Sequence, residues 1–440
     1  MSFSSAISGL NAAANNISVI SNNIANANTT GFKQSVAQFA DVYSNNFHGA
    51  NANIGGTTQP GNGVSVVQDT QQFTQGSSQT TGNNLDMAIN GNSFFTLAPN
   101  PAQPSSVVYS RAGSFQVNNT GMITNAQGQA LMAYKPNDPN SAAAGFSTGA
   151  MSTVSVPSGT GLPTATTAIN LSVNLNASSL PPSTAIFNPL DATSYTSQTS
   201  TTTYDSLGGA HNLTSYFVAP TAPVTTWSAY HYITDNPAAP IPIDAPVIPI
   251  VPGAPGTPDS LAFNATGQLT SAGQLGSVSA GATLSWTPPA GAIINTTFDY
   301  GNTTQIASAF NVNSSSQNGM ISGTLTGVSV DSKGVISANY SNGSSTALGQ
   351  VALATFNNPQ GLSQLGGSNW GQSSASGAPL PGAAGGGQFG TIQSGAVEQS
   401  NVNLSEQLVD LITAQQAYQA NSQSISAQNK MVETIMNAIR

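Results

Sequence analysis

Cysteine is absent from this sequence, and charge of either sign is scarce. Without cysteine the chain can form no disulfides, thiolate metal sites or cysteine nucleophiles. Charged residues make up 5% of the 440 residues, against roughly 25% in ordinary soluble domains. Only six are Lys or Arg, and none of them lies between Lys135 and Lys333. Binding to nucleic acid or to an anionic lipid surface requires clustered basic side chains, so the composition excludes both classes of partner.

Long apolar runs are missing as well. No segment approaches the ~18 consecutive apolar residues of a membrane-spanning helix, so the sequence predicts no membrane insertion. Residues 1–7 (MSFSSAI) combine neither a basic region nor a continuous apolar core, and they do not resemble a cleavable secretory signal. The polar surface must come from Asn, Ser, Thr, Gln and Gly. A length beyond the ~250–300 residues at which single cores stop growing predicts several domains.

The N-terminal end carries a heptad pattern. Two columns of positions are apolar throughout, which is typical of a coiled-coil seam. Yet residues 3–27 include six Asn, five Ser and one Gly, all poor helix formers. The segment is either an amphipathic helix packed on its own domain or a helix that needs neighbouring subunits. The first column is Phe3, Leu10, Ile17 and Ile24, and the second is Ala6, Ala13, Ile20 and Ala27.

A second heptad column runs along the C-terminal end. The columns beside it are mostly polar in their middle, as at Asn421 and Gln428. Asn403, with Glu406 three residues later, predicts a capped helix start. A helix over 404–439 would span about 54 Å, too long for a small domain, which indicates an element of assembly. The column consists of Leu404, Leu411, Tyr418, Ile425, Val432 and Ile439.

Between the two ends, short strand patterns alternate with turn residues. Asn90-Gly91 separates two apolar runs and predicts a hairpin. Residues 205–209 (DSLGG) predict a turn between strands over 199–204 and 213–218. The sequence therefore predicts an α+β multidomain fold. Its terminal helices should form a coiled-coil-like domain, and its middle domains should be mainly β, of the β-sandwich or barrel type.

Two segments of the middle have biased composition. Residues 237–258 contain eight prolines, which predicts an extended surface loop. Residues 371–390 are rich in Gly, Ser and Ala, which predicts a linker.

No constellation of catalytic or metal-binding residues stands out. The three histidines, His48, His211 and His231, form no H-x-x-x-H pattern. Asp205 and His211 flank a Gly-Gly turn, but they lack a third partner in the sequence, which favours a polar turn over a catalytic or metal pair. We therefore expect no enzyme, no cofactor and no metal site.

Both ends closely resemble the flagellar rod and hook protein family of bacteria. At the N-terminus the resemblance rests on residues 8–13 (SGLNAA) and 21–33 (SNNIANANTTGFK). At the C-terminus it rests on residues 394–402 (SGAVEQSNV) and 414–421 (AQQAYQAN). These motifs are long and specific, and they cover both ends of the chain.

The middle resembles the hook proteins of that family in particular. The matching motifs are Phe94-Phe95, residues 109–115 (YSRAGSF) and residues 204–208 (YDSLG). Rod proteins of the family are generally shorter and lack so large an insert. Within the same system, a distal-rod or hook-associated junction protein is the alternative. A secreted β-rich adhesin would explain the composition but not the paired heptad ends.

The resemblance implies a discontinuous domain plan and a set of partners. The chain would polymerise with itself under a hook cap, next to rod and hook–filament junction proteins, after export by the flagellar type III apparatus. The tube would be curved and would act as a universal joint outside the cell. The heptad residues would form the polymer interface, and residues 1–32 and about 397–440 would order only on assembly. The implied parts are 1–32 with 397–440 (terminal helices), 33–70 with 370–396 (connecting segment), 71–145 with 300–369 (inner β domain) and 146–299 (outer β domain).

Overall fold

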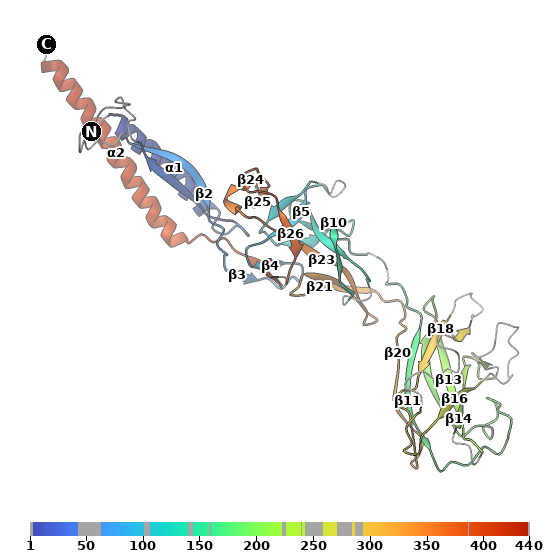
Figure 1. The fold of residues 1–440 in the computed structure, drawn as a ribbon. Coiled ribbons are helices and arrows are strands. Elements are labelled where there is room, and N and C mark those ends of the chain that lie inside the picture. The colour runs from blue at the N-terminus through green and yellow to red at the C-terminus, as the bar shows by residue number, and fades with distance from the viewer. Residues whose placement is uncertain are drawn as a thin grey trace. The chain divides into compact units, whose positions relative to one another are not determined.

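The computed structural model describes residues 3–42, 63–100, 106–139, 144–157, 159, 161–221, 226–238, 240–242, 258–270, 284–286, 294–385 and 387–438. Helices lie at the two ends of the chain, and the middle is built from strands (Figure 1), which confirms the predicted fold class. The chain divides into two compact units. Unit 1 comprises residues 1–158, 327–339 and 345–440, and unit 2 comprises residues 159–326 and 340–344.

The terminal helices α1 (Phe3–Ala25) and α2 (Leu404–Ala438) pack side by side in unit 1 (Figure 1). Asn403 caps the start of α2, because its side-chain oxygen accepts hydrogen bonds from the backbone N–H groups of Ser405 and Glu406. Within the described part of the chain, neither helix has the length and apolar character needed to cross a membrane.

A two-stranded antiparallel ribbon follows α1 and packs against it. Its strands are β1 (Ser35–Asp41) and β2 (Val64–Gln71). Phe39 lies opposite Val66 in the ribbon, and both side chains are partly exposed. The ribbon therefore continues the apolar surface of the helices.

The rest of unit 1 is organised around a 12-stranded sheet that mixes strands from both halves of the chain. Strand β23 pairs with β9 and β5, which come from more than 200 positions earlier in the sequence. The described strands beyond the ribbon, and the 3-10 helix η2, are β3 (Ser78–Thr80), β4 (Met87–Asn90), β5 (Phe94–Ala98), β6 (Val108–Ser110), β7 (Phe115–Val117), β8 (Ile123–Asn125), β9 (Ala130–Pro136), β10 (Phe146–Thr153), β21 (Leu325–Val330), β22 (Val335–Tyr340), β23 (Ser345–Thr355), η2 (Pro359–Gly361), β24 (Ser363–Gly366), β25 (Asn369–Gly371), β26 (Leu380–Ala383), β27 (Thr391–Ser394) and β28 (Ala396–Glu398).

Two local predictions were wrong in unit 1. Asn90-Gly91 does not close a hairpin, because β4 pairs with β27 while β5 pairs with β6, β9 and β23. The segment 371–390 is not a plain linker, because it contains β26, which pairs with β23. In both cases the returning C-terminal half of the chain supplies hydrogen-bond partners that no local pattern reveals.

Unit 2 is a sandwich of two five-stranded sheets that share one apolar core. Val173 of one sheet and Phe217 and Trp227 of the other are buried in that core. The predicted turn at 205–209 is confirmed between β12 and β13, where Gly208 has a positive φ of 85°. The strands are β11 (Ala168–Asn176), β12 (Ser197–Tyr204), β13 (Ala210–Val218), β14 (Thr226–Ile233), β15 (Ile241–Pro242), β16 (Asp259–Ala262), β17 (Leu284–Trp286), β18 (Ile294–Asp299), β19 (Thr304–Ile306) and β20 (Asn311–Gln317). Most of the predicted proline-rich loop, 243–257, lies outside the described residues, as does His48.

Candidate functional site

The packing of α1 against α2 is antiparallel and uses small and amide side chains. Near the end of α1, the buried Asn23 donates a hydrogen bond to Oε1 of Gln407, at 2.8 Å. Towards its start, a Cβ added at Gly9 would lie 2.9 Å from Oδ1 of Asn421, so the two helices approach closely there. The face of α2 that meets α1 is therefore the column of Gln407, Ala414 and Asn421, which lies beside the predicted apolar column.

The predicted seam residues are divided between the inside and the outside of the subunit. On α1, Ile20 is buried, Leu10, Ile17 and Ile24 are half-buried, and Phe3 is exposed. On α2, Leu411 and Ile425 are half-buried, whereas Leu404, Tyr418 and Val432 are exposed. Ile439 lies outside the described residues.

Further apolar residues of α2 are exposed in the columns beside the predicted one; Leu408, Ile435 and Met436 are visible in the sequence as apolar positions of those columns, but the predicted interface did not include them. They lie beside the predicted column in two separate groups, one near the start of α2 and one near its end, and within each group the spacing of three or four residues brings side chains onto a shared face. This set is Leu408, Val409, Ile412, Met431, Ile435 and Met436.

A groove of about 360 Å³ lies between α1, β1 and the first half of α2; we call it the helix–ribbon groove. Its lining is mixed, with apolar side chains beside amide and hydroxyl groups, and Asp410 is its single charged residue. The apolar side chains that line it are Val19, Ile20, Val36, Ala37, Phe39, Ala414 and Ala417.

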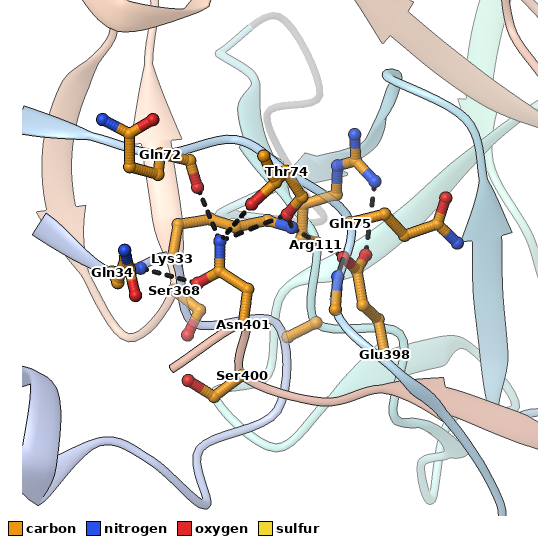
Figure 2. Close-up of polar contacts among 12 residues, drawn as sticks. Lys33, Gln34, Gln72, Thr74, Gln75, Arg111, Ser368, Glu398, Ser400 and Asn401 are labelled. Carbon is orange, nitrogen blue, oxygen red and sulfur yellow. Dashed lines mark hydrogen bonds and ion pairs between the residues drawn. The ribbon is translucent and has the colours of Figure 1, made fainter. Parts of the chain in front are cut away.

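A buried cluster of charges joins the segment that follows α1 to the strand that precedes α2 (Figure 2). The Nζ atom of Lys33 lies 2.6 Å from Oε1 of Glu398, and Nη1 of Arg111 lies 3.2 Å from Oε2 of the same carboxylate. All three side chains are at most 1% exposed. Lys33 also donates to the carbonyl of Thr74, and the guanidinium of Arg111 lies 5.0 Å from the centre of the Phe94 ring.

Burial shapes the electrostatics of this cluster. Desolvation lowers the pKa of Lys33 below its ordinary value, with Arg111 adding to the effect, and the attraction of Glu398 only partly opposes it. Desolvation also lowers the pKa of the Arg111 guanidinium, and Glu398 again opposes it. One carboxylate thus compensates two buried cations, which makes Glu398 the residue on which the cluster depends.

Asn401 fixes the chain just before α2 (Figure 2). Its side-chain oxygen accepts from the backbone N–H of Gln34, and its side-chain nitrogen donates to the carbonyls of Gln72 and Thr74. Together with the charge cluster, these bonds connect segments that are between 287 and 367 residues apart. The sequence did contain a signal for this cluster. The chain has only 21 charged residues (six basic, fifteen acidic), yet three of them, Lys33, Arg111 and Glu398, fall inside the motifs noted in the sequence.

Unit 2 contains two histidines in polar networks. His211 lies between two carboxylates, with Nε2 3.1 Å from Asp205 and Nδ1 2.6 Å from Asp235, so the third partner missing from the sequence pattern is Asp235. His231 is buried, and Ser215, Asp259 and Tyr300 contact its ring nitrogens. In the part of the chain that the structure describes, no three His, Asp or Glu side chains are arranged to hold a metal ion.

Four family profiles match consecutive parts of the chain. The profile for "Flagella basal body rod protein" matches residues 3–33, and the one for "Flagellar basal body rod FlgEFG protein C-terminal" matches residues 393–438. In between, "Flagellar hook protein FlgE/F/G D1 domain" matches residues 88–176, and "Flagellar basal body protein FlaE D2 domain" matches residues 174–320.

Similar proteins match over nearly the whole length. The chain is 36% identical to the flagellar hook protein FlgE of Salmonella typhimurium over 438 residues, covering 99% of this chain and 100% of that protein. It is 35% identical to the FlgE of Escherichia coli with the same coverage. Among solved structures, the Helicobacter pylori flagellar hook protein FlgE2 shares the fold, with a TM-score of 0.50 and 15% identity over 73% of this chain and 99% of that one.

Proposed function

The chain belongs to the flagellar hook protein family, and on that premise we propose that it polymerises into the flexible, curved tube of the hook, which transmits motor torque from rod to filament. Its place is the hook of the bacterial flagellum, attached to the basal body. The alternative within the same system, a distal-rod or junction protein, is not favoured, because the relatives that match the full chain are hook proteins.

The observation that best supports polymerisation is that apolar side chains of the terminal helices remain exposed in the single subunit. Phe3 and Ile7 on α1, and Leu404, Leu408 and Ile412 on α2, are each more than 35% exposed. Large apolar side chains left exposed at both ends of the helix pair mark a surface for protein–protein contacts. Because α1 carries no charged side chain and α2 only four, we infer that the subunits hold together mainly by apolar packing and by amide and hydroxyl contacts.

We propose that the predicted seam residues belong to this interface. Their division between half-buried and exposed positions supports a role in which each helix packs once within the subunit and again against neighbours. The proposed interface residues are Phe3, Leu10, Ile17, Ile20, Ile24, Leu404, Leu411, Tyr418, Ile425, Val432 and Ile439.

We further propose the four-part domain plan and the partners that it implies. Separate profile matches at the two ends and over two middle segments support terminal, inner and outer parts, with the two middle profiles meeting at residues 174–176. The partners are further copies of the chain, the rod, the hook cap, the hook–filament junction proteins and the type III export apparatus. The role is structural, so the subunit needs neither catalysis nor a cofactor.

Electron microscopy of the purified, full-length chain after polymerisation tests the proposal. Curved, supercoiled tubes are expected, whereas straight rods would favour the distal-rod alternative. A chain that stays monomeric under all assembly conditions would contradict the proposed function. As a matched pair, Ile412→Ser should reduce tube formation, while Leu365→Ser, at a similarly exposed site on β24, should not.

A further inference from the structure

The C-terminal end of α2 extends beyond the helix that packs against it. Asn23 meets Gln407, and Gly9 meets Asn421, so each residue of α1 lies opposite a residue of α2 whose number is close to 430 minus its own. By this register the start of α1 reaches only to about residue 427 of α2. Figure 1 shows α2 continuing beyond the start of α1, and all residues over 429–438 are exposed.

This projecting end carries two of the chain's eight methionines on an apolar stripe. At about 100° per residue, the order around the helix is Met431, Ile435, Val432 and Met436, which places the two methionines at the edges of the stripe. The side chains of Met431 and Met436 are 64% and 68% exposed. Small solutes therefore reach both of them in the single subunit.

The other methionines of the described residues are less exposed than these two. Met87 is 0% and Met132 is 1% exposed, Met122 and Met151 are half-buried, and Met320 is 37% exposed. The chain also has no cysteine, so no thiolate competes for an oxidant. Accessibility therefore singles out the two methionines of the stripe as the sulfur atoms that an oxidant meets first.

Hydrogen peroxide converts a methionine to its sulfoxide without help from any other residue. One oxygen atom passes to the thioether sulfur as the O–O bond breaks and an S–O bond forms, and the proton on that oxygen moves to the departing oxygen, which leaves as water. The sulfur loses two electrons and the peroxide gains them. The product is a polar side chain in place of a flexible apolar one, and methionine sulfoxide reductases reverse the step.

The position of the two methionines gives this change a consequence for assembly. Val432, which lies between them on the stripe, belongs to the proposed polymer interface. A sulfoxide at either edge would carry a polar oxygen into a contact made by apolar side chains, where desolvation without a hydrogen bond is unfavourable. Oxidation should therefore weaken the contact without breaking the chain.

We propose that Met431 and Met436 form an oxidation site for peroxide, and that their conversion to sulfoxides in the free subunit blocks its addition to the hook. The block rests on the proposed polymerisation, whereas the site itself rests only on the exposure of the two side chains. In the assembled form the same contact shields the stripe, so the free subunit is the sensitive state.

Peptide mapping by mass spectrometry tests the site. In the full-length monomer treated with hydrogen peroxide, Met431 and Met436 should each gain one oxygen atom at least about tenfold faster than the buried Met87 and Met132. In assembled tubes the rate at the two stripe positions should fall at least about tenfold. Equal rates at all four methionines of the monomer would overturn the site, and unchanged rates in tubes would overturn the block.

The assembly of peroxide-treated subunits tests the block. The oxidised wild-type chain should need at least about a tenfold higher concentration to form tubes, and sulfoxide reductase treatment should reverse this change. Met431→Leu/Met436→Leu should assemble like the wild type, because Leu and Met have similar volumes, and peroxide should leave its assembly unchanged. The matched control Met122→Leu/Met320→Leu keeps both stripe methionines and should remain as sensitive as the wild type.

A second variant needs no oxidant. Met431→Gln/Met436→Gln places polar side chains of similar length at the two edges of the stripe and should raise the concentration needed for assembly, as oxidation does. Oxidised wild-type chains that form tubes at the untreated concentration would overturn the block and leave the hook function standing. Failure of the untreated wild type to assemble would instead contradict the proposed function, while peptide mapping of the monomer still decides the site.

Discussion

The ammonium group of Lys33 lies 2.6 Å from the carboxylate of Glu398, although 365 residues separate them in the sequence. The bond connects the segment after α1 to the strand before α2, and both side chains are almost completely buried. Arg111 binds the other oxygen of the same carboxylate. The two helical ends are therefore fixed to the β part of unit 1 at one point.

The substitution Glu398→Gln should strongly destabilise the packing around this charge cluster. The substitution leaves Lys33 and Arg111 buried without a counter-charge, and removing one partner of a buried ion pair costs about 3–5 kcal/mol. In hydrogen-exchange mass spectrometry, the amides of β3 and β28 should exchange at least about a hundredfold faster. The control Glu406→Gln, at an exposed position in the first turn of α2, should leave these rates unchanged; equal effects of both substitutions would contradict the assignment.

Gly9→Leu should weaken the assembled form. A Cβ at this position already lies 2.9 Å from Asn421, so a larger side chain must push the helices apart, at a cost of about 1–3 kcal/mol. The thermal dissociation temperature of assembled tubes, followed by light scattering, should fall. Gly9→Leu/Asn421→Ala should recover part of the loss, and Asn11→Leu, on the exposed side of α1, serves as the control.

Unit 2 should lose stability as the pH falls through the acid range. Burial raises the pKa of Asp205, but hydrogen bonds from His211, Gly209 and Leu207 outweigh it and hold the pKa below the ordinary value of 3.8. The unfolded chain then takes up the proton first, so the stabilisation is complete above about pH 4 and is lost below it.

Urea unfolding of the wild type and of Asp205→Asn at several pH values measures this effect. The buried Trp227 reports on unit 2. The difference in unfolding free energy between the two chains should shrink as the pH falls below about 4. Asp299→Asn, at an exposed carboxylate of the same unit, is the control, and a constant difference for Asp205→Asn would rule out the linkage.

In the monomer, we expect disorder only in the helices themselves. Gly31 donates to the carbonyl of Glu398, and Asn401 is held by three backbone groups, so both flanking segments belong to the packed part of unit 1. A variant that lacks residues 1–25 and 404–440 keeps Lys33, Arg111 and Glu398. Its monomer should show nearly the same helical circular dichroism as the full-length monomer. If truncation instead removes the signal of 58 helical residues (23 in α1, 35 in α2), the helices are ordered before assembly.

Local patterns succeeded where one segment supplies its own partners. The start of α2 was predictable because Asn403 caps the helix within four residues, and the β12–β13 hairpin was predictable because Asp205 and Gly208 form its turn. The pattern at Asn90-Gly91 misled because β4 pairs with β27, about 300 residues away. His211 could not be assigned a full set of partners, since Asp235 lies just beyond the end of β14, 24 residues further along the chain.

The sequence by itself determined the terminal helices, the β-rich middle and the family, because periodicity, capping and motifs are local properties of the chain. It also determined the absence of disulfides and the scarcity of charge. Only the tertiary structure decided which of those few charges meet, at Lys33, Arg111 and Glu398, and which apolar residues of α2 stay exposed. Both depend on segments hundreds of residues apart packing together, and no single segment carries that information.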